Sequence, residues 1–187
     1  MARSKKNLSK KKVPQQISVS STPPLTALEL RLIRDLLCAI NNSDFAARFP
    51  WLLKKTWNVL GSRNPEVTEG CRSIGKKAME MSLCILSLDV HGGIEKGLPI
   101  GLSDSLERCF YSEQVLFAIL KKADEKQATR IASIGVPTAK VGQVRDGVML
   151  FAGGMWSEGQ DLTAVMSWVN GLFRSLVAVA IKSYKSV

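Results

Sequence analysis

The chain has 187 residues, of which 45% are hydrophobic, and it carries a net charge of +10. This composition is too apolar for a chain disordered throughout, and the length suits one buried core with a tail. The charge is uneven, because residues 1–24 contain basic side chains and no acidic one. These basic residues are Arg3, Lys5, Lys6, Lys10, Lys11 and Lys12. Such asymmetry predicts an anionic partner: nucleic acid, an acidic protein or a membrane surface.

Residues 1–24 are expected to form a disordered basic arm. They combine lysine clusters with Ser, Gln and Pro, and they lack the apolar periodicity of a helix or strand. Six cations on a flexible arm can neutralise several phosphates without regard to base sequence. Three other roles stay open for the same segment: a nuclear localisation signal, a contact for anionic lipid and a solubilising tail.

Residues 25–187 are expected to form a single all-α domain, a compact bundle of six or seven helices. The first helix begins at a capping box, in which Thr26 and Glu29 each bond the other's backbone N–H. A second short helix is expected from Pro50 to Gly61. A third begins at Asn64 and Pro65 and ends at the glycines that follow His91.

The third helix has the most regular apolar stripe in the chain. Its members recur in alternating steps of four and three, which predicts one buried helix face. The members are Val67, Cys71, Ile74, Ala78, Met81, Ile85 and Leu88. Beyond Met79 the other faces also become apolar, so the second half of the helix is expected at the centre of the core.

The second half of the chain contains further helices. A glycine-rich connector covers 92–102, and a helix starting near Asp104 is expected to bury Leu106, Phe110, Phe117 and Leu120. A short helix follows at 125–134, whereas 138–152 fits either a helix or an extended segment. The last helix starts at Asp161. It is long enough to span a bilayer, but Asn170 and Arg174 near its middle favour a core helix.

Residues 70–77, GCRSIGKK, approach the phosphate-binding pattern G-x-x-x-x-G-K-[ST]. Lys77 replaces the hydroxyl residue that would hold Mg²⁺, and the polar segment before the motif does not predict a strand. We therefore interpret the motif as helix, with its glycines explained by close helix packing and with Ile74 facing the core. Arg72, Lys76 and Lys77 would then form a basic surface patch that meets phosphates from outside. Lys54, Lys55, Arg63, Lys121 and Lys122 are candidates to extend it. An ordinary solvated surface is the alternative.

No residue pattern singles out a catalytic centre. His91 is the only histidine, no Cys-x-x-Cys pair occurs, and no two carboxylates stand out for acid–base chemistry. The cysteines are Cys38, Cys71, Cys84 and Cys109, and we expect free thiols in a reducing compartment, with Cys71 and Cys84 packed as small apolar residues. We expect no enzyme activity, no cofactor and no metal.

The layout of a basic arm on a helical body favours a structural protein that binds nucleic acid, with RNA as the favoured form, and associates with itself. Viral coat and nucleocapsid proteins have such a layout. The residues expected to serve self-association are Trp156, Trp168 and Phe173. The alternatives are a matrix-like protein at an anionic membrane surface and a helical regulatory protein with a nuclear signal. The location expected is intracellular, in cytoplasm or nucleus, or in a virion.

Overall fold

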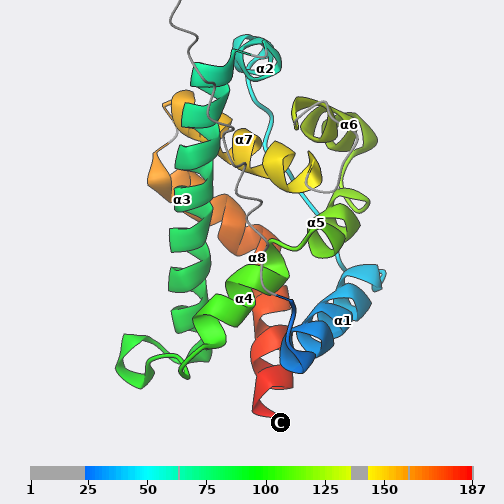
Figure 1. The fold of residues 1–187 in the computed structure, drawn as a ribbon, viewed down its shortest axis with the longest axis vertical. Coiled ribbons are helices and arrows are strands. Elements are labelled where there is room, and N and C mark those ends of the chain that lie inside the picture. Colours follow the sequence, from blue (N-terminus) through cyan, green and yellow to red (C-terminus); the bar gives the residue numbers. More distant parts are fainter. Residues whose placement is uncertain (1–23, 63, 136–142, 160, 187) are drawn as a thin grey trace, which may run out of the picture.

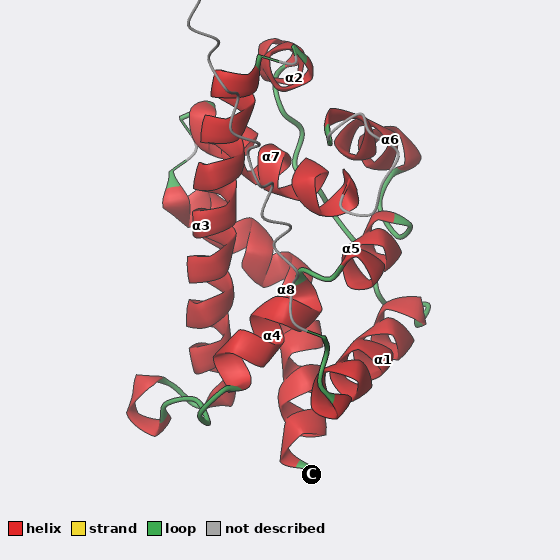
Figure 2. Ribbon diagram, in the orientation of Figure 1, coloured by secondary structure: helices red, strands yellow, loops and turns green. Residues whose placement is uncertain are grey.

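The structure is a computed structural model that describes residues 24–62, 64–135, 143–159 and 161–186. Within these ranges the chain is all-α, with eight α-helices, one 3₁₀-helix and no strand (Figures 1 and 2). The all-α prediction is therefore confirmed. The elements are α1 (Ala27–Asn41), α2 (Lys54–Gly61), α3 (Pro65–His91), η1 (Ile94–Lys96), α4 (Leu102–Phe110), α5 (Glu113–Leu120), α6 (Glu125–Ile134), α7 (Gln143–Ser157) and α8 (Leu162–Lys185).

Helix ends follow the local signals closely. The Thr26 backbone N–H donates to the Glu29 carboxylate at 2.7 Å, and the Glu29 N–H donates to the Thr26 hydroxyl at 3.2 Å, which confirms the capping box of α1. Asn64 caps α3 in front of Pro65, and Gly92 ends this helix at a φ of 121°. Asp161 caps α8 by accepting from the Ala164 N–H at 3.0 Å.

Two predicted helix boundaries are wrong. Residues 50–53 are not helical and α2 begins only at Lys54. Tertiary bonds hold the preceding chain, because the Gln127 side chain donates to the Phe49 carbonyl at 2.8 Å. The single helix expected from Asp104 is two helices, since Ser112 caps a new one by accepting from the Val115 N–H. That break leaves Phe117 half exposed instead of buried.

Helix α7 lies at the centre of the fold, between α3 on one side and α6 on the other (Figure 1). The segment left ambiguous by the sequence is therefore helical from Gln143 onward, and its residues 138–142 lie outside the described ranges. Its glycines lie where other helices approach it. A Cβ on Gly147 would overlap the Ile131 carbonyl of α6, and one on Gly153 would overlap the Cys71 carbonyl of α3.

The buried face of α3 differs from the predicted one. The residues of α3 that face the core are Gly75, Ala78, Met79, Ser82, Leu83, Leu86 and Ser87. Of the predicted apolar stripe only Ala78 is among them, and Ile74, predicted to face the core, is 43% exposed. The buried serines are satisfied within the helix, because the Ser82 and Ser87 hydroxyls donate to the Ala78 and Leu83 carbonyls. Small residues on this face let α7 approach closely.

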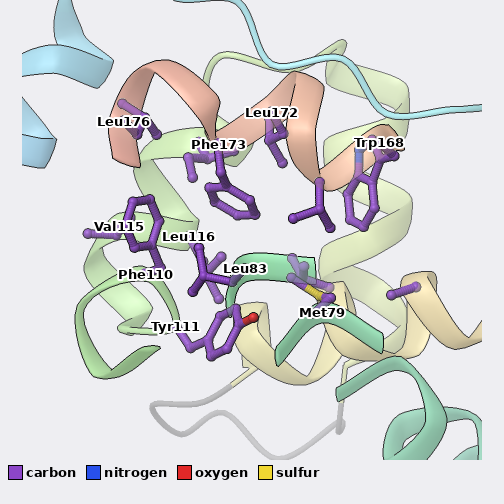
Figure 3. Close-up of a cluster of buried hydrophobic side chains, with 14 of the residues drawn as sticks. Met79, Leu83, Phe110, Tyr111, Val115, Leu116, Trp168, Leu172, Phe173 and Leu176 are labelled. Carbon is purple, nitrogen blue, oxygen red and sulfur yellow. The ribbon is translucent and has the colours of Figure 1, made fainter. Parts of the chain in front are cut away.

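Helix α8 supplies much of the hydrophobic core. Its buried aromatic ring, Phe173, meets Phe110 of α4 edge to face at a centroid distance of 5.2 Å (Figure 3). Trp168 lies five residues earlier, and its indole N–H donates to the Arg48 carbonyl at 3.1 Å. The helix is long and apolar enough to cross a membrane, with a mean hydropathy of 1.6, but half of that stretch is buried inside this fold.

Candidate functional site

Lys76 and Lys77 are exposed on α3, whereas Arg72 is partly buried against α7, and carboxylates partner all three. The Arg72 guanidinium forms an ion pair with Glu69 and lies 3.7 Å from the Asp146 carboxylate of α7. The ammonium groups of Lys76 and Lys77 each lie 3.4 Å from a carboxylate oxygen of Glu80. The patch therefore offers much less positive charge than three cations would.

The structure does not join the other candidate cations to this patch. Lys121 and Lys122 follow the end of α5, which lies across the molecule from α3 (Figure 1). The Lys122 ammonium donates to the carbonyls of Asn41 and Asn42 at the end of α1. Lys54 and Lys55 start α2, beside the N-terminal end of α3, and Arg63 lies outside the described residues.

The predicted arm residues also lie outside the described ranges, which begin at Pro24. These residues are Arg3, Lys5, Lys6, Lys10, Lys11 and Lys12. Their role stays a prediction from charge and composition.

The three residues predicted for self-association differ in accessibility. Phe173 is fully buried and Trp168 is 8% exposed, so both belong to the core of the chain itself. A second copy could reach them only if that core opened. Trp156, at the end of α7, is 41% exposed and borders a hollow against α3. The apolar residues of α8 are there because the helix packs in the core of its own chain. Their pattern therefore does not indicate a surface for self-association.

A polar cluster that the sequence gave no sign of joins α3, α4 and α7. Burial raises the pKa of Glu107, and the neighbouring Glu80 raises it further through its charge and a hydrogen bond between the two carboxyl groups. Lys76 and Arg145 lower it in part. The nearby Tyr111 hydroxyl is buried and has no hydrogen-bond partner among the described residues, and burial raises its pKa. Glu80 and Glu107 lie far apart in sequence, so only the packing of α3 on α4 pairs them.

The raised pKa of Glu107 makes stability depend on pH. The folded chain holds this proton more tightly than the unfolded chain, so stability falls as the pH rises above the ordinary value of 4.5. Glu107→Gln removes the titrating carboxyl group, and with it the loss of stability that this group causes as the pH rises. Urea unfolding at pH 4.5 and pH 7.5 should show the variant gaining stability relative to the parent as the pH rises. Glu95→Gln, in the exposed η1, is the control, and parallel pH profiles for Glu107→Gln and the parent would contradict the assignment.

The cysteines differ from their prediction in one respect. Cys84 is exposed on α3, contrary to the expectation that it packs as a small apolar residue. Burial raises the pKa of Cys71, and it raises that of Cys109 to about 12, so neither thiol is an activated nucleophile. His91 ends α3, and its buried Nδ1 finds no hydrogen-bond partner in the part of the chain that the structure describes. No group of three or more His, Cys, Asp or Glu among the described residues is placed to hold a metal ion.

Comparisons of this chain with protein families, with curated proteins and with solved structures found no match.

Proposed function

We propose that this chain is a non-enzymatic structural protein that binds nucleic acid, with RNA as the expected form, through the charge of its arm. In the same proposal its folded body associates with further copies, in the manner of a viral coat or nucleocapsid protein. The observation that carries the proposal is the separation of charge. Residues 1–24 hold six of the ten net positive charges, and on α3 of the body the cations are paired with carboxylates.

The physics of such an arm is counterion release. Each phosphate neutralised by a lysine or arginine frees a condensed cation, and this makes affinity fall steeply with salt. For single strands the slope of log affinity against log salt is about −0.7 for each contact, so six contacts give a slope of about −4. The paired cations of α3 add little to this, because Glu80 already lies beside Lys76 and Lys77.

The test compares the full chain with a variant in which all six basic arm residues are glutamine. We expect the parent to bind single-stranded RNA with a slope near −4 and the variant to lose at least about 100-fold in affinity at low salt. The matched control is Lys76→Gln with Lys77→Gln, which should change affinity less than threefold. Fluorescence anisotropy over a salt series measures all three proteins, with duplex DNA as a second ligand. Equal binding by parent and arm variant would refute the proposal.

A second candidate function, contact with an anionic membrane, has its own observation. Trp51 is 62% exposed and Leu53 is 53% exposed, and the two lysines that start α2 follow them directly. Exposed Trp and Leu beside lysines are the residue types that enter a lipid interface. Sedimentation with anionic vesicles distinguishes the candidates, since Trp51→Ala with Leu53→Ala should weaken vesicle binding and leave RNA binding unchanged.

A further inference from the structure

Helix α3 has an apolar stripe that the other described residues leave partly exposed. We call it the α3 ridge, and its members are Val67, Gly70, Ile74, Met81, Ile85 and Leu88. At 3.6 residues per turn these six positions fall within about 60° of one another around the helix. Val67 is 37% exposed, and Ile74, Met81 and Ile85 are 43–44% exposed. One helix therefore places four large exposed apolar residues in a single line.

The ridge is distinct from the face with which α3 packs in its own fold. Gly75, Met79 and Leu83 face α7 and the core from another side of the helix. Outside its central turn, where Lys77 and Ala78 lie, the ridge is spaced in steps of three and four (67–70–74 and 81–85–88), and such spacing is the pattern by which one helix packs along another. Trp156 of α7 and Leu162 of α8 border the ridge at Ile74 and Met81, and the ridge side chains stay partly exposed among the described residues. A helix from outside this chain is the partner that the spacing fits.

Gly70 gives an independent indication. It lies inside α3, where glycine costs about 1 kcal/mol relative to alanine. No atom of the described residues lies within 4 Å of the position that its Cβ would take, so the packing of these residues does not require glycine there. Gly75, five residues on, differs because a Cβ there would overlap α7. A glycine that is not needed within the chain suits a surface that another backbone or large side chain approaches.

The ridge has nearly the same order of apolar positions when α3 is read in the opposite direction. Turning α3 end for end about the point between Lys77 and Ala78 places Val67 at the level of Leu88, and Ile74 at the level of Met81. It also places Gly70 at the level of Ile85, a vacant position facing a large side chain. A two-fold interface requires such a surface, because the same patch must fit itself. The ridge meets that requirement with apolar residues at every level outside the central turn.

We propose that two copies of this chain pack α3 against α3, antiparallel, about a two-fold axis near Lys77. The inference rests on the self-association part of the proposed function and assigns it a surface, in place of the buried Trp168 and Phe173. The hollow of about 480 Å³ bordered by Ile74, Met81 and Trp156 receives side chains of the second copy. The Lys77 residues of both copies flank the axis, and Glu80 beside each compensates their charge.

Nucleic acid fits this surface less well than a second copy does. The ridge is apolar, and the cations beside it are already paired with Glu80 and Glu69. A duplex or single strand requires free positive charge along its path. Apolar self-complementarity along one helix therefore favours a second α3 as the occupant.

The first test places charge on the ridge. Ile74→Glu with Met81→Glu should raise the dimer dissociation constant by roughly 100-fold or more. Each substitution occurs in both copies, so the interface would have to bury both sets of new charges. The parent should sediment as a dimer at micromolar concentration, and the variant as a monomer. Leu30→Glu with Phe117→Glu changes two equally exposed apolar residues elsewhere and should leave the dimer intact. Circular dichroism and thermal melting check that each variant is folded.

A second pair of variants tests the ridge without adding charge. Gly70→Gln places a side chain at the level of the second copy's Ile85 and should also give a monomer. Gly171→Gln changes an exposed glycine of α8 with equally open surroundings and should not. Lys77→Cys tests the axis, in a background with Cys38 and Cys84 replaced by serine. It should form an intermolecular disulfide on mild oxidation, whereas Lys182→Cys on α8 should not.

A monomeric parent, or a dimer that survives both ridge variants, would overturn the inference. So would a failure of Lys77→Cys to cross-link while Lys182→Cys does. The RNA measurements are separate, because the arm variant retains the whole ridge. A dimer that binds no RNA would refute the arm proposal and leave the interface standing. A monomer that binds RNA through its arm would do the reverse.

Discussion

Gly75→Ala is expected to lower the free energy of unfolding by about 3 kcal/mol or more, enough to leave a chain of ordinary stability largely unfolded on mild heating. The added Cβ would overlap the Met149 carbonyl and lie 2.6 Å from the Gly153 backbone nitrogen. Both are backbone atoms of α7, so no rotamer change relieves the clash. The two helices must separate, and the central contact of the fold is lost.

Gly70→Ala is the matched control within the same motif. Its Cβ enters open space, so the only effect within the monomer is the better helix propensity of alanine, which raises stability by about 0.5–1 kcal/mol. Urea unfolding followed by circular dichroism measures both variants, at a concentration low enough to keep the chain monomeric. Equal effects of the two substitutions would show that α3 and α7 are not in backbone contact at Gly75.

Gly70 and Gly75 show which part of the structure can be predicted from the sequence and which part cannot. The missing hydroxyl and the helix start at Pro65 were enough to interpret GCRSIGKK as helix, and the structure confirms that interpretation. Close helix packing is the explanation that the sequence suggests for both glycines, and within the described chain it holds for Gly75 alone. Nothing local separates Gly70 from Gly75, because the difference lies in α7, more than 70 residues further along the chain.

Helix ends were predicted better than helix faces for the same reason. A cap is a bond between neighbours in sequence, so Thr26, Asn64 and Asp161 could be identified without the fold. A buried face depends on which helix packs there. The apolar stripe of α3 predicts its core side, yet the face that is buried mixes small residues with Met79, Leu83 and Leu86 and leaves Ile74 exposed.

Of the candidate site, only the distribution of charge between the arm and the body can be predicted from the sequence. Composition alone separates the arm from the body, and this needs no structure. Glu80 follows Lys76 by four residues and Lys77 by three, and this spacing on a helix predicts both ion pairs. The interpretation of these lysines as a free basic patch leaves the ion pairs out. The approach of Glu107 to Glu80 could not have been found, because it joins two helices separated by a glycine-rich connector.

Phe173→Ala is expected to lower the free energy of unfolding by about 4 kcal/mol. The side chain is fully buried and meets Phe110 edge to face, so its removal leaves a cavity between α8 and α4 that neighbouring rings cannot fill (Figure 3). The loss should appear in dilute monomer, by urea unfolding, because the contacts involved lie within one chain. Sedimentation of the folded fraction then shows whether dimerisation is affected separately.

Trp156→Ala provides the comparison, since Trp156 was predicted for self-association together with Phe173 but is partly exposed beside the α3 ridge. It should cost the monomer about 1–2 kcal/mol and weaken the dimer, because the indole borders the hollow that the second copy enters. If Phe173→Ala left dilute unfolding unchanged and abolished only association, α8 would be an interface helix. A buried α8 and an exposed α3 ridge instead require that Phe173→Ala mainly lowers the stability of the monomer and that Trp156→Ala weakens the dimer.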